Sequence, residues 1–136
     1  MTNVVLVGFK RSPFTIANKG LLASVRPEDI LSQVINDLIK TTNINKDDIE
    51  DIIAGCAYPE GAQGYNIAKI VSFMTGMPEH VGGMTINRWC GSSMQAIHSA
   101  AGAISMNAGK VFICCGIESM TSVPINGLNF SPHPEL

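Results

Sequence analysis

The chain has 136 residues, of which 46% are hydrophobic and 15% charged, and its formal net charge is −2. These values describe one folded domain with a sizeable core and exclude a disordered chain. The nine basic residues form no stripe and no apolar stretch reaches the roughly 18 residues that span a bilayer, so we expect neither nucleic-acid nor membrane partners.

The first part of the chain predicts a strand followed by a helix. Val4–Val7 is a continuous apolar run, typical of a strand buried on both faces. It has no charged n-region and no cleavage site, so we predict no signal peptide. A helix is expected from Pro27, which suits the first helical position. Glu28 and Asp29 complement the dipole of its first turn, and Lys40 that of its last.

The middle of the chain repeats this alternation. Asn45 predicts a short capped turn before a second buried strand at Ile52–Cys56. A helix is expected near Asn66–Thr75, ended by a glycine and a proline. Thr85–Trp89 is predicted as a third strand, running directly into Cys90.

From Ser92 the sequence becomes helical, and small or apolar residues occur almost all round, as in a buried helix. Val111–Cys115 predicts a fourth strand, and the chain from Pro124 onward is expected to be irregular. Strands that alternate with helices predict an α/β fold with a mostly parallel sheet covered by helices.

Four cysteines without an export signal indicate reduced thiols and a cytoplasmic location. No Cys-x-x-Cys pair exists, and the adjacent Cys114 and Cys115 suit one zinc ion poorly, so we predict no metal site. For Cys56, Cys114 and Cys115 we favour packing in the core.

Cys90 is the strongest candidate for chemistry. It lies where a strand is expected to end and a helix to begin, so free N–H groups and a partial positive charge would face its side chain. That environment stabilises a thiolate, the nucleophilic form, and offers an N–H to an oxyanion. Gly91 lets a substrate approach the backbone. From spacing alone, a small buried hydrophobe remains an equal alternative.

The wider segments resemble one family. Asn87–Ala96 reads Asn-Arg-Trp-Cys-Gly-Ser-Ser-Met-Gln-Ala, and Gly116–Thr121 reads Gly-Ile-Glu-Ser-Met-Thr. Both resemble motifs of the thiolases, and Arg11–Phe14 and Gly55 stand in the same order and spacing. Ser93, where thiolases usually have glycine, and the pair before Gly116 are departures from the pattern.

The resemblance implies an acyltransferase acting on acyl-CoA thioesters in fatty-acid metabolism, by acetoacetyl-CoA formation or 3-ketoacyl-CoA thiolysis. Cys90 would carry the acyl group, coenzyme A and acyl-CoA would be substrates, and no cofactor would be bound permanently. The chain corresponds to about the first third of a thiolase. The resemblance also implies an N-terminal domain over residues 1–123, the start of the loop domain over residues 124–136, and a homo-oligomer.

The same resemblance places five further residues near the site. Asn87 and Arg88 precede the nucleophile on a strand that thiolases pair across a dimer axis. Gly91 follows the nucleophile, Glu118 is interpreted as structural, and Met120 as a neighbour of the acyl pocket.

The Gly-His-Pro histidine and the second cysteine of thiolases have no counterpart in this sequence. His98 lies eight residues after Cys90, about 12 Å along a helix, too far for a general base. His80 and His133 fall in loops. An alternative function is therefore a catalytically silent chain or split subunit that needs the C-terminal half. A ketoacyl synthase is a second alternative, which the Asn-Arg before and the Gln-Ala after Cys90 disfavour.

Overall fold

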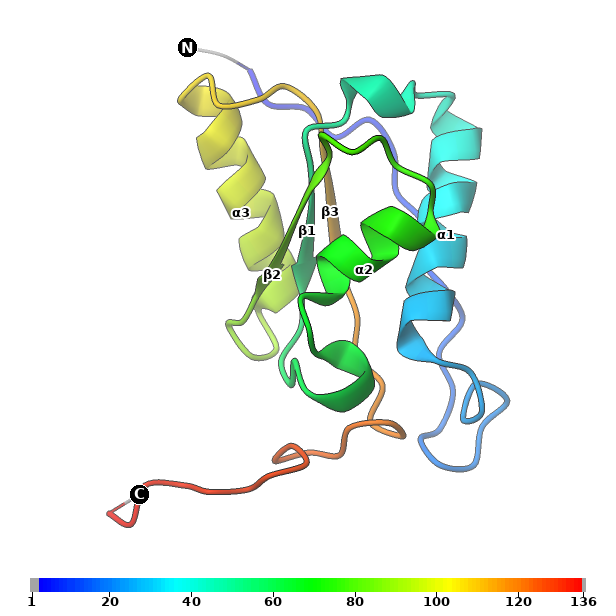
Figure 1. The fold of residues 1–136 in the computed structure, drawn as a ribbon, viewed down its shortest axis with the longest axis vertical. Helices are drawn as coiled ribbons and strands as arrows, with labels where there is room; N and C mark the ends of the chain where they lie inside the picture. The colour runs from blue at the N-terminus through cyan, green and yellow to red at the C-terminus, as the bar shows by residue number, and fades with distance from the viewer. Residues whose placement is uncertain (1–2, 136) are drawn as a thin grey trace.

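A three-stranded parallel sheet forms the centre of the computed structural model, which describes residues 3–135 (Figure 1). The strand order is β2-β1-β3, and Ile53 of β1 lies opposite Met84 of β2 and Cys114 of β3. The strands and α-helices are α1 Pro27–Thr42, β1 Asp51–Gly55, α2 Ile67–Met74, β2 Gly82–Ile86, α3 Ser92–Ser105 and β3 Phe112–Gly116. The α/β class and the parallel sheet predicted from the sequence are confirmed.

Helices cover the sheet on both faces. On one face, α1 and α2 enclose the larger part of the core (Figure 1), which includes Leu31, Ile52 and Val71. On the other face, α3 packs through Ala96 and Ala100 against Ile53. Small residues on α3 bring its backbone close to the strands, which matters for the turn that precedes this helix.

The start and end of α1 follow from its local sequence. Pro27 occupies its first turn together with the acidic Glu28 and Asp29, and Lys40 lies in its last turn. Asn43 ends the helix in the left-handed conformation, with φ of 54°. These features match the preferred residues at the two helix ends.

Two short 3-10 helices connect the main elements. The first, Lys46–Asp48, is capped by the Asn45 side chain, which accepts a hydrogen bond from the Asp47 N–H, as predicted. The second, Gly61–Gln63, lies in the loop after β1 and carries the fully buried side chain of Gln63.

The strand predicted at Val4–Val7 is wrong. These residues are irregular, and the side chains of Val5 and Leu6 are 72% and 82% exposed. In the described residues β2 and β3 are the edge strands of the sheet, and this apolar run pairs with neither of them. An apolar run indicates a tendency to be buried, but it does not identify the segment that would cover it.

The third strand begins and ends three residues earlier than predicted. Gly82 and Gly83 lie outside the predicted strand, yet both belong to β2. A Cβ on Gly83 would lie 2.5 Å from the Lys69 Cα, so this glycine allows α2 to approach the strand. The segment Asn87–Trp89, predicted as strand, forms a turn instead.

The prediction that α3 is buried all round is also wrong. Only one side of α3 meets the sheet, and the side chains of Met94, Ile97 and Met106 are exposed. Beyond Pro124 the chain is irregular, as expected, and it extends away from the sheet (Figure 1).

Candidate functional site

Cys90 lies in the turn between the end of β2 at Ile86 and the start of α3 at Ser92. Its side chain is exposed and its thiol is free. Trp89, just before it, has φ of 49°, a left-handed conformation that is rare for a large residue, and its side chain is 77% exposed. A strand thus changes into a helix within five residues, with the thiol at the surface.

Side-chain hydrogen bonds hold this turn. The Asn87 Oδ1 accepts from the Trp89 N–H at 2.8 Å. The Ser92 hydroxyl donates to the Trp89 carbonyl at 2.5 Å and accepts from the Arg88 N–H at 2.8 Å. The Gly91 N–H donates to the Arg88 carbonyl at 3.0 Å. The unusual conformation of Trp89 is therefore stabilised on both its N–H and its carbonyl side.

The first turn of α3 offers hydrogen-bond donors beside Cys90. Within residues 3–135, the backbone N–H groups of Ser93 and Met94 have no protein acceptor. Free N–H groups at a helix start carry partial positive charge. Such groups can stabilise a thiolate or the oxyanion formed when a thioester carbonyl is attacked.

Two glycines let the start of α3 approach the sheet. A Cβ on Gly55, at the end of β1, would lie 2.3 Å from the Ser92 carbonyl carbon and from the Ser93 nitrogen. A Cβ on Gly116, at the end of β3, would lie 2.8 Å from the Cβ of Ser93. The position of the Cys90 turn therefore depends on the absence of side chains at both strand ends.

Glu118 follows β3 and binds the loop that follows β1. Its Oε2 accepts from the Ala57 N–H at 2.7 Å, and its Oε1 accepts from the Gln63 Nε2 at 2.8 Å. The Gln63 amide also donates to the Tyr58 carbonyl at 2.9 Å and accepts from the Ser119 N–H. The partners of Glu118 belong to the scaffold beside the turn.

Sequence reasoning missed Gln63 as a residue of this region. A polar residue in a glycine-containing loop is ordinarily solvated, and the motif that includes Glu118 lies 55 residues further along the chain. The fold brings these residues together because the ends of parallel strands meet at one edge of the sheet.

The other cysteines differ from Cys90. Burial, and then the negative charge of Glu118, raises the pKa of Cys56 to about 12. Burial raises the pKa of Cys115 to about 12 and also raises that of Cys114. These thiols stay protonated at neutral pH, which makes them poor nucleophiles.

Arg88 and Met120 lie at the surface. The Arg88 Nη1 donates to the Gln95 Oε1 at 2.6 Å, along the first turn of α3. Met120 is 45% exposed, in the segment after β3. An open depression of about 490 Å³ is lined by Asn87, Arg88 and Trp89, immediately before the thiol.

The three histidines, His80, His98 and His133, are all exposed, and only His98 lies on α3. None forms a hydrogen bond with Cys90 in the described residues. No group of three metal-binding side chains occurs within residues 3–135. No helix of this part of the chain is both long and apolar enough to cross a membrane.

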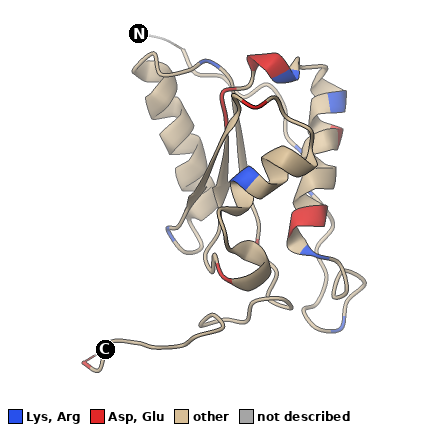
Figure 2. Cartoon of the chain, viewed as in Figure 1, with Lys and Arg blue, Asp and Glu red and all other residues tan. Residues whose placement is uncertain are grey.

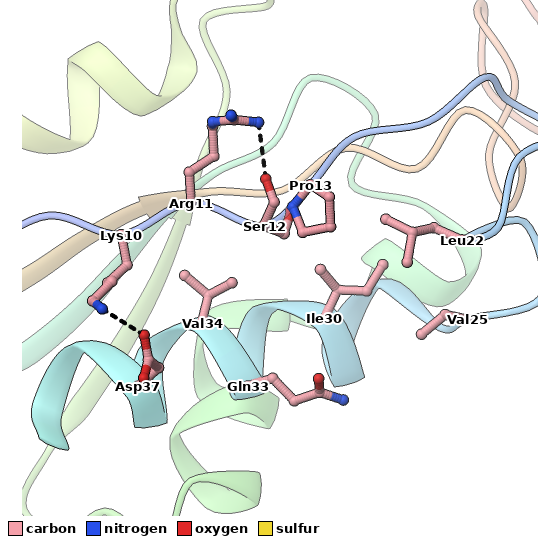
Figure 3. A pocket seen from close by; sticks show the side chains of 10 residues that line it. All are labelled: Lys10, Arg11, Ser12, Pro13, Leu22, Val25, Ile30, Gln33, Val34 and Asp37. Atoms are coloured by element: carbon pink, nitrogen blue, oxygen red, sulfur yellow. Dashed lines mark hydrogen bonds and ion pairs between the residues drawn. The ribbon is translucent and has the colours of Figure 1, made fainter. Parts of the chain in front are cut away.

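A second cavity, of about 350 Å³, lies between the N-terminal segment and α1 (Figure 3). Its rim includes Lys10, which forms an ion pair with Asp37 at 2.7 Å, and Arg11, which donates to the Ser12 carbonyl. It contains no residue of the Cys90 turn. Lysines and arginines are spread over several elements of the chain (Figure 2).

Comparisons with known proteins agree on one family. The family model described as "Thiolase, N-terminal domain" matches residues 4–132. The 3-ketoacyl-CoA thiolase of Aeromonas salmonicida is 40% identical over 134 residues, which are 97% of this chain and 35% of that protein. The 3-ketoacyl-CoA thiolase of Colwellia psychrerythraea is 39% identical over 92% of this chain and 33% of its own length.

A solved structure extends the likeness to three dimensions. The crystal structure of the Bacillus anthracis acetyl-CoA acetyltransferase superposes with a TM-score of 0.71 at 31% identity, over 76% of this chain and 26% of that chain. The present chain thus spans about a third of the length of the curated relatives it matches.

Proposed function

Because the chain belongs to the thiolase family, matching its N-terminal domain, we propose that Cys90 is the nucleophile of a thiolase-type acyl transfer between coenzyme A thioesters. The observation that carries the proposal is the position of this exposed, free thiol between a left-handed residue and the start of α3. This placement combines access for a substrate with nearby N–H donors.

The proposed first half-reaction is the acylation of Cys90. With acetyl-CoA, the Cys90 sulfur bonds to the thioester carbonyl carbon, the bond from that carbon to the coenzyme A sulfur breaks, and the thiol proton ends on coenzyme A. With a 3-ketoacyl-CoA, the sulfur bonds to the C3 carbonyl carbon, the C2–C3 bond breaks, and the proton ends on C2 of the released acetyl-CoA. N–H groups at the start of α3 would stabilise the oxyanion on the way. In the second half-reaction, the acyl group passes to coenzyme A or to a carbanion of acetyl-CoA.

The names of similar proteins include both a 3-ketoacyl-CoA thiolase and an acetyl-CoA acetyltransferase. Acylation of the nucleophile is common to cleavage and to synthesis, so the proposal concerns that shared step. We place it in fatty-acid metabolism and in the cytoplasm, where four free cysteines would remain reduced.

The experiment is the intact mass of the purified protein after incubation with acetyl-CoA or acetoacetyl-CoA, with Cys90→Ala as the control. We expect a mass increase of one acetyl group in the parent protein and none in the variant. No adduct on protein that circular dichroism shows to be folded, or an equal adduct on Cys90→Ala, would contradict the proposal for this chain.

A second candidate function is that of a subunit that becomes active only with a complementary chain. It is favoured by the exposed histidines, none of which bonds to Cys90 among the described residues, and by the exposed apolar side chains of α3. Exposed apolar surface of this kind is typical of a face that another chain covers, including a second copy in a homo-oligomer. Sedimentation of the parent and of a Met94→Lys/Ile97→Lys variant tests this: association should be lost in the variant.

The proposed N-terminal domain comprises residues 1–123, and residues 124–136 would begin the loop domain. Limited proteolysis should therefore cut after Val123 before it cuts within the sheet and helices.

A further inference from the structure

A chain of hydrogen bonds runs from Glu118 to the turn that carries Cys90. The Glu118 carboxylate accepts from the Ala57 N–H at 2.7 Å. The carbonyl of the same residue, Ala57, accepts from the Asn87 Nδ2 at 2.9 Å. The Asn87 Oδ1 then accepts from the N–H of Trp89 at 2.8 Å.

This chain connects all three strand ends. Glu118 follows β3, Ala57 follows β1, and Asn87 follows β2. The last link reaches Trp89, the residue with φ of 49° that directly precedes the thiol. Left-handed conformations in large residues persist only where surrounding contacts fix them.

The far end of the chain is anchored in the core. The other carboxylate oxygen of Glu118 accepts from the amide of Gln63, whose side chain is fully buried. The thiol of Cys56, protonated because its pKa is raised to about 12, lies 3.8 Å from the same oxygen. Gln63 and Cys56 therefore hold the Oε1 atom of Glu118, while its Oε2 atom binds Ala57.

We propose that Glu118 and Asn87 are positioning residues for Cys90, acting through the backbone of Ala57 to hold Trp89 in its left-handed conformation. The inference rests on the proposed function, in which Cys90 is the nucleophile. In the described residues Glu118 forms no hydrogen bond with Cys90, so its effect has to pass through the intermediate residues.

The test measures the rate at which iodoacetamide alkylates Cys90, followed by peptide mass, in Asn87→Ala, Glu118→Ala and the double variant. Each single substitution is expected to lower the rate about five- to tenfold, the effect of losing about one hydrogen bond. The double variant should be no slower than the slower single variant, because both break one connection. Additive losses in folded variants, or unchanged rates, would overturn the proposal.

Two controls separate positioning from other effects. Glu118→Gln keeps the size and one acceptor oxygen, so its rate should lie between those of the parent and Glu118→Ala. A through-space effect of the Glu118 charge predicts the opposite, namely equally faster alkylation in both variants, since a nearby negative charge disfavours a thiolate. Asn66→Ala removes a side-chain amide that binds the Gly83 carbonyl of β2 without touching the turn, and should leave the rate unchanged.

Alkylation needs no acyl-CoA, so the two hypotheses fail separately. If the parent forms no acyl adduct while the variants lose alkylation as expected, the proposed function fails and the positioning role stands. If the parent is acylated while the variants alkylate like the parent, the positioning role fails and the function stands.

Discussion

Replacing Gly55 by alanine is expected to displace the start of α3 and so disturb Cys90. The φ of Gly55 lies outside the left-handed region, so an alanine could adopt its backbone conformation. The added Cβ would lie 2.3 Å from the Ser92 carbonyl carbon and the Ser93 nitrogen, and 2.6 Å from the Ser92 oxygen. All three are backbone atoms, which cannot rotate away as a side chain could.

The size of the effect follows from these distances. Non-bonded heavy atoms rest at about 3.5–4.0 Å, so the first turn of α3 has to retreat by roughly 1 Å. Overpacking of this kind costs about 1–3 kcal/mol. A shift of about 1 Å in a reacting group can lower a rate on the order of a hundredfold. We therefore expect a lower free energy of unfolding and a slower acylation of Cys90.

Gly102→Ala is the matched control. Gly102 lies within α3, and a Cβ there would have no atom within 4 Å. Alanine is preferred to glycine in a helix interior by about 1 kcal/mol, so this substitution should stabilise the protein. The same substitution is thus expected to lower the free energy of unfolding at Gly55 and to raise it at Gly102.

Urea unfolding followed by circular dichroism measures both stabilities, and iodoacetamide alkylation measures the reactivity of Cys90. If Gly55→Ala keeps the urea midpoint and the alkylation rate of the parent, the close approach of α3 to β1 does not position Cys90 and the reasoning is refuted.

Four further predictions concern the surroundings of the turn. Iodoacetamide at neutral pH should label Cys90 in the folded protein and reach Cys56 and Cys115 only after unfolding; equal labelling would contradict the raised pKa of both buried thiols. In the folded protein Cys56 and Cys115 have a pKa of about 12, whereas the pKa of an unfolded thiol is near 9.0. The stability that these thiols contribute is therefore complete below pH 9.0 and falls as the pH rises toward 12. The fall is up to about 1.4 kcal/mol per pH unit for each thiol. Urea titrations should show a smaller fall in Cys56→Ala. Gln63→Leu should lower the free energy of unfolding by about 1–3 kcal/mol, because the Tyr58 carbonyl and the Ser119 N–H lose their partner; an unchanged midpoint would show that water replaces it. Trp89→Val should lower the free energy of unfolding, while that of Trp89→Gly should stay within about 1 kcal/mol of the parent, because glycine adopts a φ of 49° without steric strain. Equal urea midpoints of the two variants, followed by circular dichroism, would refute this.

Local sequence signals were sufficient for α1 and for the start of α3. Proline and acidic residues in the first turn and Lys40 in the last turn predict the helix that the structure has at Pro27–Thr42. The junction before Ser92 was predicted from the same kind of evidence. In both cases the information lies within a few residues of the feature, which is the range over which helix capping acts.

Features that depend on residues far away along the chain could not be predicted from the sequence. The run Val4–Val7 has the composition of a buried strand, but composition does not show whether it pairs, and in the described residues it pairs with neither edge strand of the sheet. The burial of Gln63 depends on Glu118 and Ser119, which come 55 and 56 residues later. Composition could not predict these pairings, because a polar residue is buried only where the fold brings partners to it.

Trp89 is the position where local preference and structure disagree most, and the disagreement has a consistent physical explanation. A left-handed conformation costs a non-glycine residue about 1–2 kcal/mol. Hydrogen bonds from Asn87 and Ser92 can offset that cost, at about 1 kcal/mol each. Because Trp89 is 77% exposed, packing of its ring contributes little to the balance. The conformation of the Cys90 turn therefore depends on its hydrogen bonds, and the reactivity of the thiol should follow them more closely than it follows the hydrophobic core.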